Sequence, residues 1–148
     1  MNRLNLRLRA GGEIIRKAGD MALAAFHESG VQWQEKGPGD LVTQADLDIE
    51  AMIRARITRH FADDAVVGEE GGGTVAPQGH SWLIDPIDGT VNFARKIGYF
   101  CISLALLRAA VPVAAWIYDP VLGELFFADA DRKAWLNGRP IRVSNVSE

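Results

Sequence analysis

The stretch of sequence that most constrains the fold reads WLIDPIDGT at residues 82–90. Its apolar start predicts a buried strand, which leads into two carboxylates, Asp85 and Asp88, with Pro86 fixing the backbone between them. Burying this much negative charge is costly unless a cation compensates it. Asp88-Gly89-Thr90 then predicts a helix start, where free backbone N–H groups favour an anion. The stretch indicates a place where a metal ion and a phosphate could meet, although an Asp-Pro turn followed by an Asp N-cap is the simpler interpretation.

A second pair of carboxylates, Glu69 and Glu70, follows Val66-Val67 and Gly68, again at the end of a predicted strand. If the two strands are neighbours, their acidic ends converge. Three or more convergent carboxylates make an all-oxygen site, which suits Mg²⁺ better than Zn²⁺. The alternative is a solvated Glu-Glu pair at the start of the glycine-rich loop that begins at Gly71.

A third motif lies upstream and reads KGPGDLVTQAD at residues 36–46. It combines a lysine, Lys36, with a rigid turn and the start of a predicted helix. Thr43 is the expected N-cap, and Asp46 lies in the first turn, where its charge complements the helix dipole. These structural roles do not exclude chemical ones.

Around these motifs the sequence predicts an α+β fold. Apolar residues recur at helical spacing over about 2–28 and 43–60. Gly11-Gly12 interrupts the first helix, so that helix starts there or a frayed turn precedes it, and Ser29-Gly30 ends it. Strands are expected at 66–67, 82–84, 101–107, 113–118, 124–127 and 133–136. The turns between them favour an antiparallel meander with both helices packed on one face.

Composition narrows the class of protein. The 148 residues suffice for one compact domain, and we expect a single metal-binding domain over 1–148. A net charge of −3 argues against nucleic-acid binding, and no apolar run is long enough for a membrane span.

Cys101, the only cysteine, lies in an apolar run and is expected to be a buried strand residue rather than a nucleophile. Without disulfides the chain fits a cytoplasmic location.

The three motifs together resemble the inositol monophosphatase family. They are Asp40–Asp46, then Gly68-Glu69-Glu70, then Asp85–Thr90 followed by Asn92-Phe93. The segment from Tyr118 to Ile141 also resembles family members, so the similarity covers nearly the whole chain. The resemblance implies the N-terminal half of a layered sugar-phosphatase fold. It also implies Mg²⁺-dependent hydrolysis of a small phosphomonoester, with myo-inositol monophosphate as the first candidate. Histidinol phosphate, fructose bisphosphate and adenosine bisphosphate are substrates of related enzymes.

The resemblance also implies a ligand set for two or three Mg²⁺ ions. Glu69 and Asp85 would bind the first ion together with the backbone carbonyl of Ile87. Asp85 would bridge to a second ion, with Asp88 as a further ligand. Glu70 would lie behind these ligands rather than among them.

Catalytic roles follow from the same resemblance. Asp46 and Thr90 would polarise the attacking water, and the backbone amides of Gly89 and Thr90 would hold phosphate oxygens. Lys36 is a further candidate that would lie near the phosphate or a third metal ion, or merely on the surface. No covalent phosphoenzyme is required, because metal ions can stabilise both the attacking and leaving oxygens.

The sequence departs from the family in length. Members carry a further domain with a Trp-Asp motif that completes the second metal site, and nothing after Asn145 can play that part. The chain is a fragment, works with a separate partner chain, or is a natural short form without catalysis; we favour the fragment. A fragment should leave an apolar face exposed and tend to dimerise or aggregate, and family members suggest a homodimer. A metal-binding interaction module that needs a partner chain is the alternative to an active enzyme.

Overall fold

The computed structural model describes residues 3–28, 30, 32–38, 40–130 and 133–146. The elements along the chain are α1 (Arg3–His27), β1 (Trp33–Gly37), β2 (Asp40–Thr43), α2 (Gln44–His60), β3 (Ala65–Gly68), β4 (His80–Asp88), α3 (Thr90–Ala94), β5 (Cys101–Arg108), β6 (Val111–Asp119), β7 (Glu124–Asp129), β8 (Ala134–Leu136) and β9 (Arg139–Ile141). Asn2 and Ser29, the predicted flanks of the first helix, lie outside the described residues. Within the described residues, no helix has the length and apolar character needed to cross a lipid bilayer.

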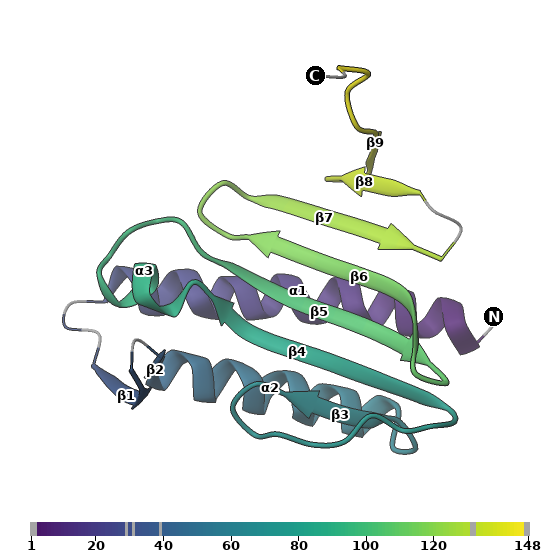
Figure 1. Cartoon of the computed structure of the whole chain (residues 1–148), viewed down its shortest axis with the longest axis horizontal. Coiled ribbons are helices and arrows are strands. Elements are labelled where there is room, and N and C mark those ends of the chain that lie inside the picture. The colour runs from purple at the N-terminus through teal and green to yellow at the C-terminus, as the bar shows by residue number, and fades with distance from the viewer. Residues whose placement is uncertain (1–2, 29, 31, 39, 131–132, 147–148) are drawn as a thin grey trace.

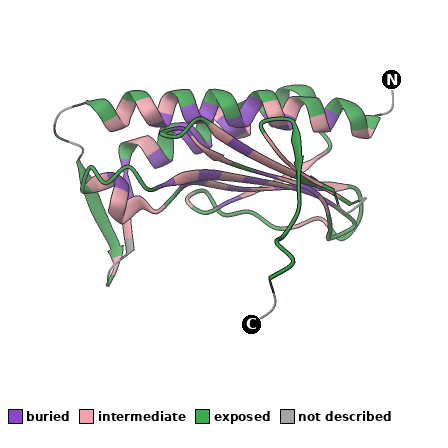
Figure 2. Cartoon of the chain, turned by 90° about the horizontal axis from the view of Figure 1, so that it is seen from above, coloured by how far each residue is buried: buried purple, intermediate pink, exposed green. Residues whose placement is uncertain are grey.

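Seven strands form one sheet in the order β3-β4-β5-β6-β7-β8-β9, and β1 pairs with β2 in a separate hairpin. Only β3 and β4 run parallel; every other neighbouring pair in the large sheet is antiparallel. Helices α1 and α2 lie side by side on one face of this sheet (Figures 1 and 2). The predicted α+β class, with two helices on a mainly antiparallel sheet, is confirmed.

The core lies between the two helices and the sheet. Ile15 of α1 and Ile53 of α2 are fully buried, as are Trp82 of β4 and Leu104 of β5. Side chains alternate between the faces of a strand, so one set packs under the helices and the next points to the opposite face. The opposite face carries Leu83, Ala105 and Ile117, and Ile117 is 45% exposed. No helix of the described chain covers this second face (Figure 2), which we call the open sheet face.

Helix α1 passes through Gly11 and Gly12 without a break, so the interruption predicted at these glycines is wrong. The glycines are explained by packing rather than by a helix end. A Cβ on Gly11 would lie 2.6 Å from the Trp116 ring, whereas a Cβ on Gly12 would meet its nearest neighbour at 3.8 Å. Gly11 therefore lets the helix approach β6 closely, and Gly12 has no such role.

This difference gives a matched pair of variants. We expect Gly11→Ala to lower the free energy of unfolding by about 1–3 kcal/mol, because the added methyl group forces the Trp116 ring to move. Gly12→Ala should instead raise it by up to about 1 kcal/mol through better helix propensity. Urea unfolding of both variants measures the difference. Equal effects would contradict the close packing of α1 on β6.

One predicted strand boundary is corrected, and one hairpin was missed. The strand expected at 82–84 continues through Asp88, because a bulge between Asp85 and Asp88 keeps β4 paired with β5 past Pro86. The β1–β2 hairpin was not predicted at all. Trp33, Gln34 and Glu35 are all exposed and lack the alternation that marks a half-buried strand.

Candidate metal and phosphate site

The parallel pairing of β3 and β4 brings the two acidic motifs together. Gly68 is paired with Ile84 in the ladder, so Glu69, the first residue after β3, comes to lie beside Asp85, which stays in β4. The Glu69 backbone N–H donates to the Ile84 carbonyl at 3.1 Å, and the side chains of Glu69 and Asp85 line the same hollow. The predicted convergence of these strand ends is present in the structure.

The bulge in β4 sets the position of the next residues. Asp88 is opposite Cys101 of β5, and the Cys101 thiol lies 3.8 Å from the Asp88 carboxylate. Gly89 follows at a φ of 96°, a left-handed conformation that favours glycine, and α3 begins at Thr90. The bulge and the glycine thus turn the chain from the sheet into a helix within two residues of Asp88.

Asp46 joins this group from the start of α2. It is 1% exposed and forms a capping box with Thr43, whose backbone N–H donates to the Asp46 carboxylate at 2.8 Å. The other Asp46 oxygen lies 3.2 Å from the Thr90 hydroxyl, which also donates to the Ile87 carbonyl at 2.9 Å. Asp46 therefore both caps α2 and contacts Thr90. Burial raises the pKa of Asp46, while hydrogen bonds from Thr43 and Thr90 oppose that rise.

The surroundings of Asp85 disfavour its ionised form. Burial, followed by the charges of Glu69 and Asp88, raises its pKa from 3.8 to about 7. Its Oδ1 atom is buried and has no hydrogen-bond partner among the residues that the structure describes. A buried, partnerless carboxylate oxygen among other carboxylates is costly unless a cation or a proton neutralises it.

Lys36 and Glu70 lie at the outer edge of the group. The Lys36 ammonium is 2.8 Å from Glu70 and 3.5 Å from Glu69. The Glu70 side chain is 7% exposed and the Glu69 side chain 44%. Lys36 therefore partly balances the charge of the acidic loop, and Glu70 is turned toward that lysine.

The donor set fits a hard divalent cation. Glu69, Asp85 and Asp88 supply carboxylate oxygens, and Ile87 can supply a carbonyl oxygen, which are the ligands that Mg²⁺ prefers. In the conformation that the described residues adopt, no three His, Cys, Asp or Glu side chains are gathered closely enough to hold a metal ion. Glu69 and Asp88 have exposed side chains that can rotate, whereas Asp85 is fixed in the sheet.

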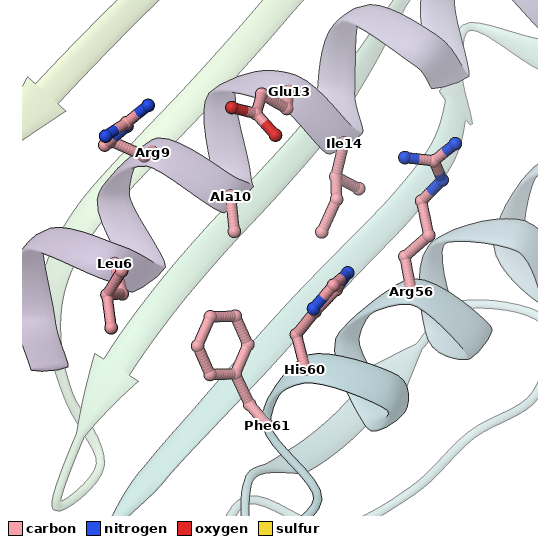
Figure 3. Close-up of a pocket in the computed structure, with 8 residues that line it drawn as sticks. All are labelled: Leu6, Arg9, Ala10, Glu13, Ile14, Arg56, His60 and Phe61. Carbon is pink, nitrogen blue, oxygen red and sulfur yellow. The ribbon is translucent and has the colours of Figure 1, made fainter.

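Two hollows on the open sheet face flank Asp85 and Asp88. One of about 500 Å³ is lined by Glu69 and Asp85, and one of about 460 Å³ by Asp88, Gly89 and Asn92. A separate hollow of about 380 Å³ lies between α1 and α2 (Figure 3). Glu13 is the only carboxylate among its described lining residues. His60 in its wall is 14 residues along α2 from Asp46, or about 21 Å, so this hollow is remote from the carboxylates.

Comparison with known proteins identifies the family. A profile of the inositol monophosphatase family matches residues 7–148. The chain belongs to this family. Inositol monophosphatase 1 of Solanum lycopersicum is 36% identical over 140 residues, covering 90% of this chain and 50% of that protein. The histidinol-phosphatase of Chlorobaculum parvum is 35% identical over 136 residues, covering 92% and 52%.

Solved structures of similar proteins have the same fold as this chain. The extragenic suppressor protein suhB from Bartonella henselae superposes with a TM-score of 0.90 at 31% identity, covering 95% of this chain and 55% of that one. The Thermotoga maritima IMPase gives a TM-score of 0.84 at 32% identity, covering 98% and 55%. The chain thus spans about half the length of the inositol monophosphatase relatives that it matches.

One residue near the site differs from its prediction, and two others were not predicted. Cys101 is half-buried on the open sheet face rather than fully buried. Burial and then the nearby Asp88 raise its thiol pKa to about 12, which agrees with a residue that is not a nucleophile. The missed residues are Glu50 and Arg54 of α2, which lie under the loop that carries Glu69. Their spacing of four on one helix face was the available signal.

Proposed function

We propose that this chain provides the metal and phosphate site of a Mg²⁺-dependent phosphomonoesterase. The observation that carries the proposal is Asp85, a sheet-fixed carboxylate with a buried, unpartnered oxygen between Glu69 and Asp88. Glu69, Asp85 and Asp88, with the Ile87 carbonyl, would hold two or three Mg²⁺ ions. Such ions lower the pKa of a water nucleophile and neutralise charge on phosphoryl oxygens.

The neighbouring residues have complementary tasks. The Thr90 hydroxyl contacts the Asp46 carboxylate and the Ile87 carbonyl; in this proposal it would orient the attacking water, and Asp46 would take up the proton of that water. The backbone N–H groups of Gly89 and Thr90 would donate to phosphate oxygens, since the first amides of a helix have no partner within it. Lys36, at the rim, would attract the anionic substrate.

The relatives support a proposal for the class of substrate. Proteins similar to this one are named for inositol monophosphate and for histidinol phosphate. Both compounds are phosphomonoesters of small polar alcohols. We propose myo-inositol monophosphate as the first substrate and histidinol phosphate as the second.

Phosphate release tests the proposal. We expect the purified chain to release inorganic phosphate from myo-inositol monophosphate only when Mg²⁺ is present. Asp88→Asn should reduce the rate by about 100-fold or more, because it removes a charged ligand. Asp63→Asn, an exposed carboxylate remote from the site, serves as the matched control and should leave the rate unchanged. A rate independent of Mg²⁺, or equal in Asp88→Asn and wild type, would contradict the proposal.

The open sheet face favours a second candidate function. Ile117 is paired with Phe126, and both line the hollow that Asp88 also lines, which places an apolar strip beside Asp88. In a chain of half the family length, this strip is a surface on which a second copy or a separate partner chain could pack. A metal-binding module that needs such a partner would bind Mg²⁺ without releasing phosphate, so calorimetry beside the phosphate assay distinguishes the two functions.

A further inference from the structure

The loop that carries Glu69 is anchored from beneath by a carboxylate of α2. Glu50 is 2% exposed. One of its oxygens accepts the backbone N–H of Glu70 at 2.8 Å, and the other accepts the backbone N–H of Gly71 at 2.9 Å. The carboxylate therefore bonds the two amides that directly follow Glu69.

Arg54, one turn along α2, completes this anchor. Its Nε donates to Glu50 at 2.6 Å, and its remaining nitrogens donate to the backbone carbonyls of Val66 and Gly72. These carbonyls lie on either side of the acidic loop, whose base is closed by a hydrogen bond of 3.0 Å from Gly68 to Gly72. The pair thus contacts both the strand that enters the loop and the turn that leaves it.

The glycines of the loop fit this buried pair. A Cβ on Gly68 would lie 2.2 Å from the Glu50 carboxylate, and a Cβ on Gly71 would lie 2.7 Å from it. Only residues without side chains allow the backbone to approach Glu50 so closely. The Gly-Glu-Glu-Gly sequence at 68–71 is therefore matched to Glu50 as well as to the proposed metal.

The hydrogen bonds fix Glu69 from both sides. Its own N–H is bound to Ile84 of β4, and the next N–H along the chain is bound to Glu50. The backbone on either side of the Glu69 Cα is thereby held, and the side chain projects beside Asp85. Since the Glu69 side chain itself is 44% exposed, its direction depends on this backbone.

We propose that Glu50, braced by Arg54, is a positioning residue that presents Glu69 to the metal site. This inference rests on the proposed function, because it assumes that Glu69 binds a metal ion. A carboxylate suits the task because it accepts hydrogen bonds on both oxygens while carrying a charge that pairs with Arg54. Glutamine in its place must turn an NH₂ group toward one of the donors.

Glu50→Gln tests the inference, with Glu13→Gln, an exposed glutamate of α1, as the matched control. Without metal, we expect the amides of Glu70 and Gly71 to exchange hydrogen at least about tenfold faster in Glu50→Gln, while core amides are unchanged. In calorimetric titration of the folded protein, its Kd for Mg²⁺ should rise about 10–100-fold. The control should match wild type in both measurements.

Arg54→Lys covers the case in which Glu50→Gln does not fold. Lysine keeps a positive charge near Glu50 but cannot reach both the Val66 and Gly72 carbonyls. The faster amide exchange and the higher Kd for Mg²⁺ should therefore both appear, each with a smaller magnitude. Unchanged exchange or an unchanged Kd in these variants would overturn the inference. If wild type itself bound no Mg²⁺, the proposed function would fail; faster exchange would then leave Glu50 as a structural anchor only.

Discussion

Asp85→Asn is expected to make the metal-free protein more stable at neutral pH while removing its response to Mg²⁺. In the wild type, burial and the charges of Glu69 and Asp88 oppose ionisation of Asp85 and raise its pKa from 3.8 to about 7. Asparagine has nearly the same shape and carries no charge. The substitution therefore removes the repulsion together with a proposed ligand.

The pH dependence has a definite sign. Between about pH 4 and about pH 7 the folded wild type binds more protons at Asp85 than the unfolded chain does. The contribution of Asp85 to the free energy of unfolding is therefore fully present below its unfolded pKa of 3.8. This contribution is lost as the pH rises through its folded pKa of about 7. Above about pH 7 we expect Asp85→Asn to exceed wild type by about 1–3 kcal/mol, a range reduced for solvent screening.

The measurement is urea unfolding across this pH range, first with a chelator and then with saturating Mg²⁺. Wild type should gain stability from Mg²⁺, about 2.7 kcal/mol at 100 times its Kd, and Asp85→Asn should gain almost none. Asp20→Asn, an exposed aspartate of α1, controls for a general charge effect. An equal gain from Mg²⁺ in Asp85→Asn and wild type would contradict the role of Asp85.

Arg7→Ala is expected to cost about 3–5 kcal/mol of stability, because it leaves a buried carboxylate without its cation. Arg7 of α1 donates to both oxygens of Asp64, at 2.6 and 2.8 Å, and the Trp82 indole N–H donates to the same carboxylate at 2.9 Å. The side chains of Arg7 and Asp64 are 7% and 2% exposed. Burial alone would raise the pKa of Asp64, but these bonds outweigh it and hold that pKa below its usual value.

Two variants distinguish the effect of leaving a buried charge unpaired from the effect of losing packing. Arg9→Ala removes an exposed arginine two residues along α1 and should change the unfolding free energy by less than about 0.5 kcal/mol. Replacing both partners, as Arg7→Met with Asp64→Leu, should cost much less than Arg7→Ala, since no charge is left buried. A double variant as unstable as Arg7→Ala would show that lost packing, rather than the unpaired charge, causes the effect.

Local patterns predicted the parts of the fold that depend on local physics. Helix α2 and its cap at Thr43 follow from periodicity and from the side-chain oxygen at the N-cap. The meander of β5, β6 and β7 follows from alternation and turn residues. The convergence of Glu69 with Asp85 required only that two strands lie next to each other, and the parallel pair provides this.

The remaining features depend on contacts between distant parts of the chain. Gly11 looked like a helix break because the Trp116 ring that occupies its space lies 105 residues later. Glu50 was missed because its partners, the amides of Glu70 and Gly71, belong to a loop with no local link to α2. No sequence pattern reveals such partners. The roles of the site residues in metal binding and catalysis remain predictions.

Crystals of the chain soaked in Mn²⁺, a stand-in for Mg²⁺ with strong anomalous scattering, would locate the metal. The proposed site predicts an anomalous peak between Glu69, Asp85 and Asp88, about 2.1–2.2 Å from their carboxylate oxygens, and no such peak in Asp85→Asn. A peak elsewhere in the molecule, or none at saturating Mn²⁺, would contradict the assignment of these carboxylates as metal ligands.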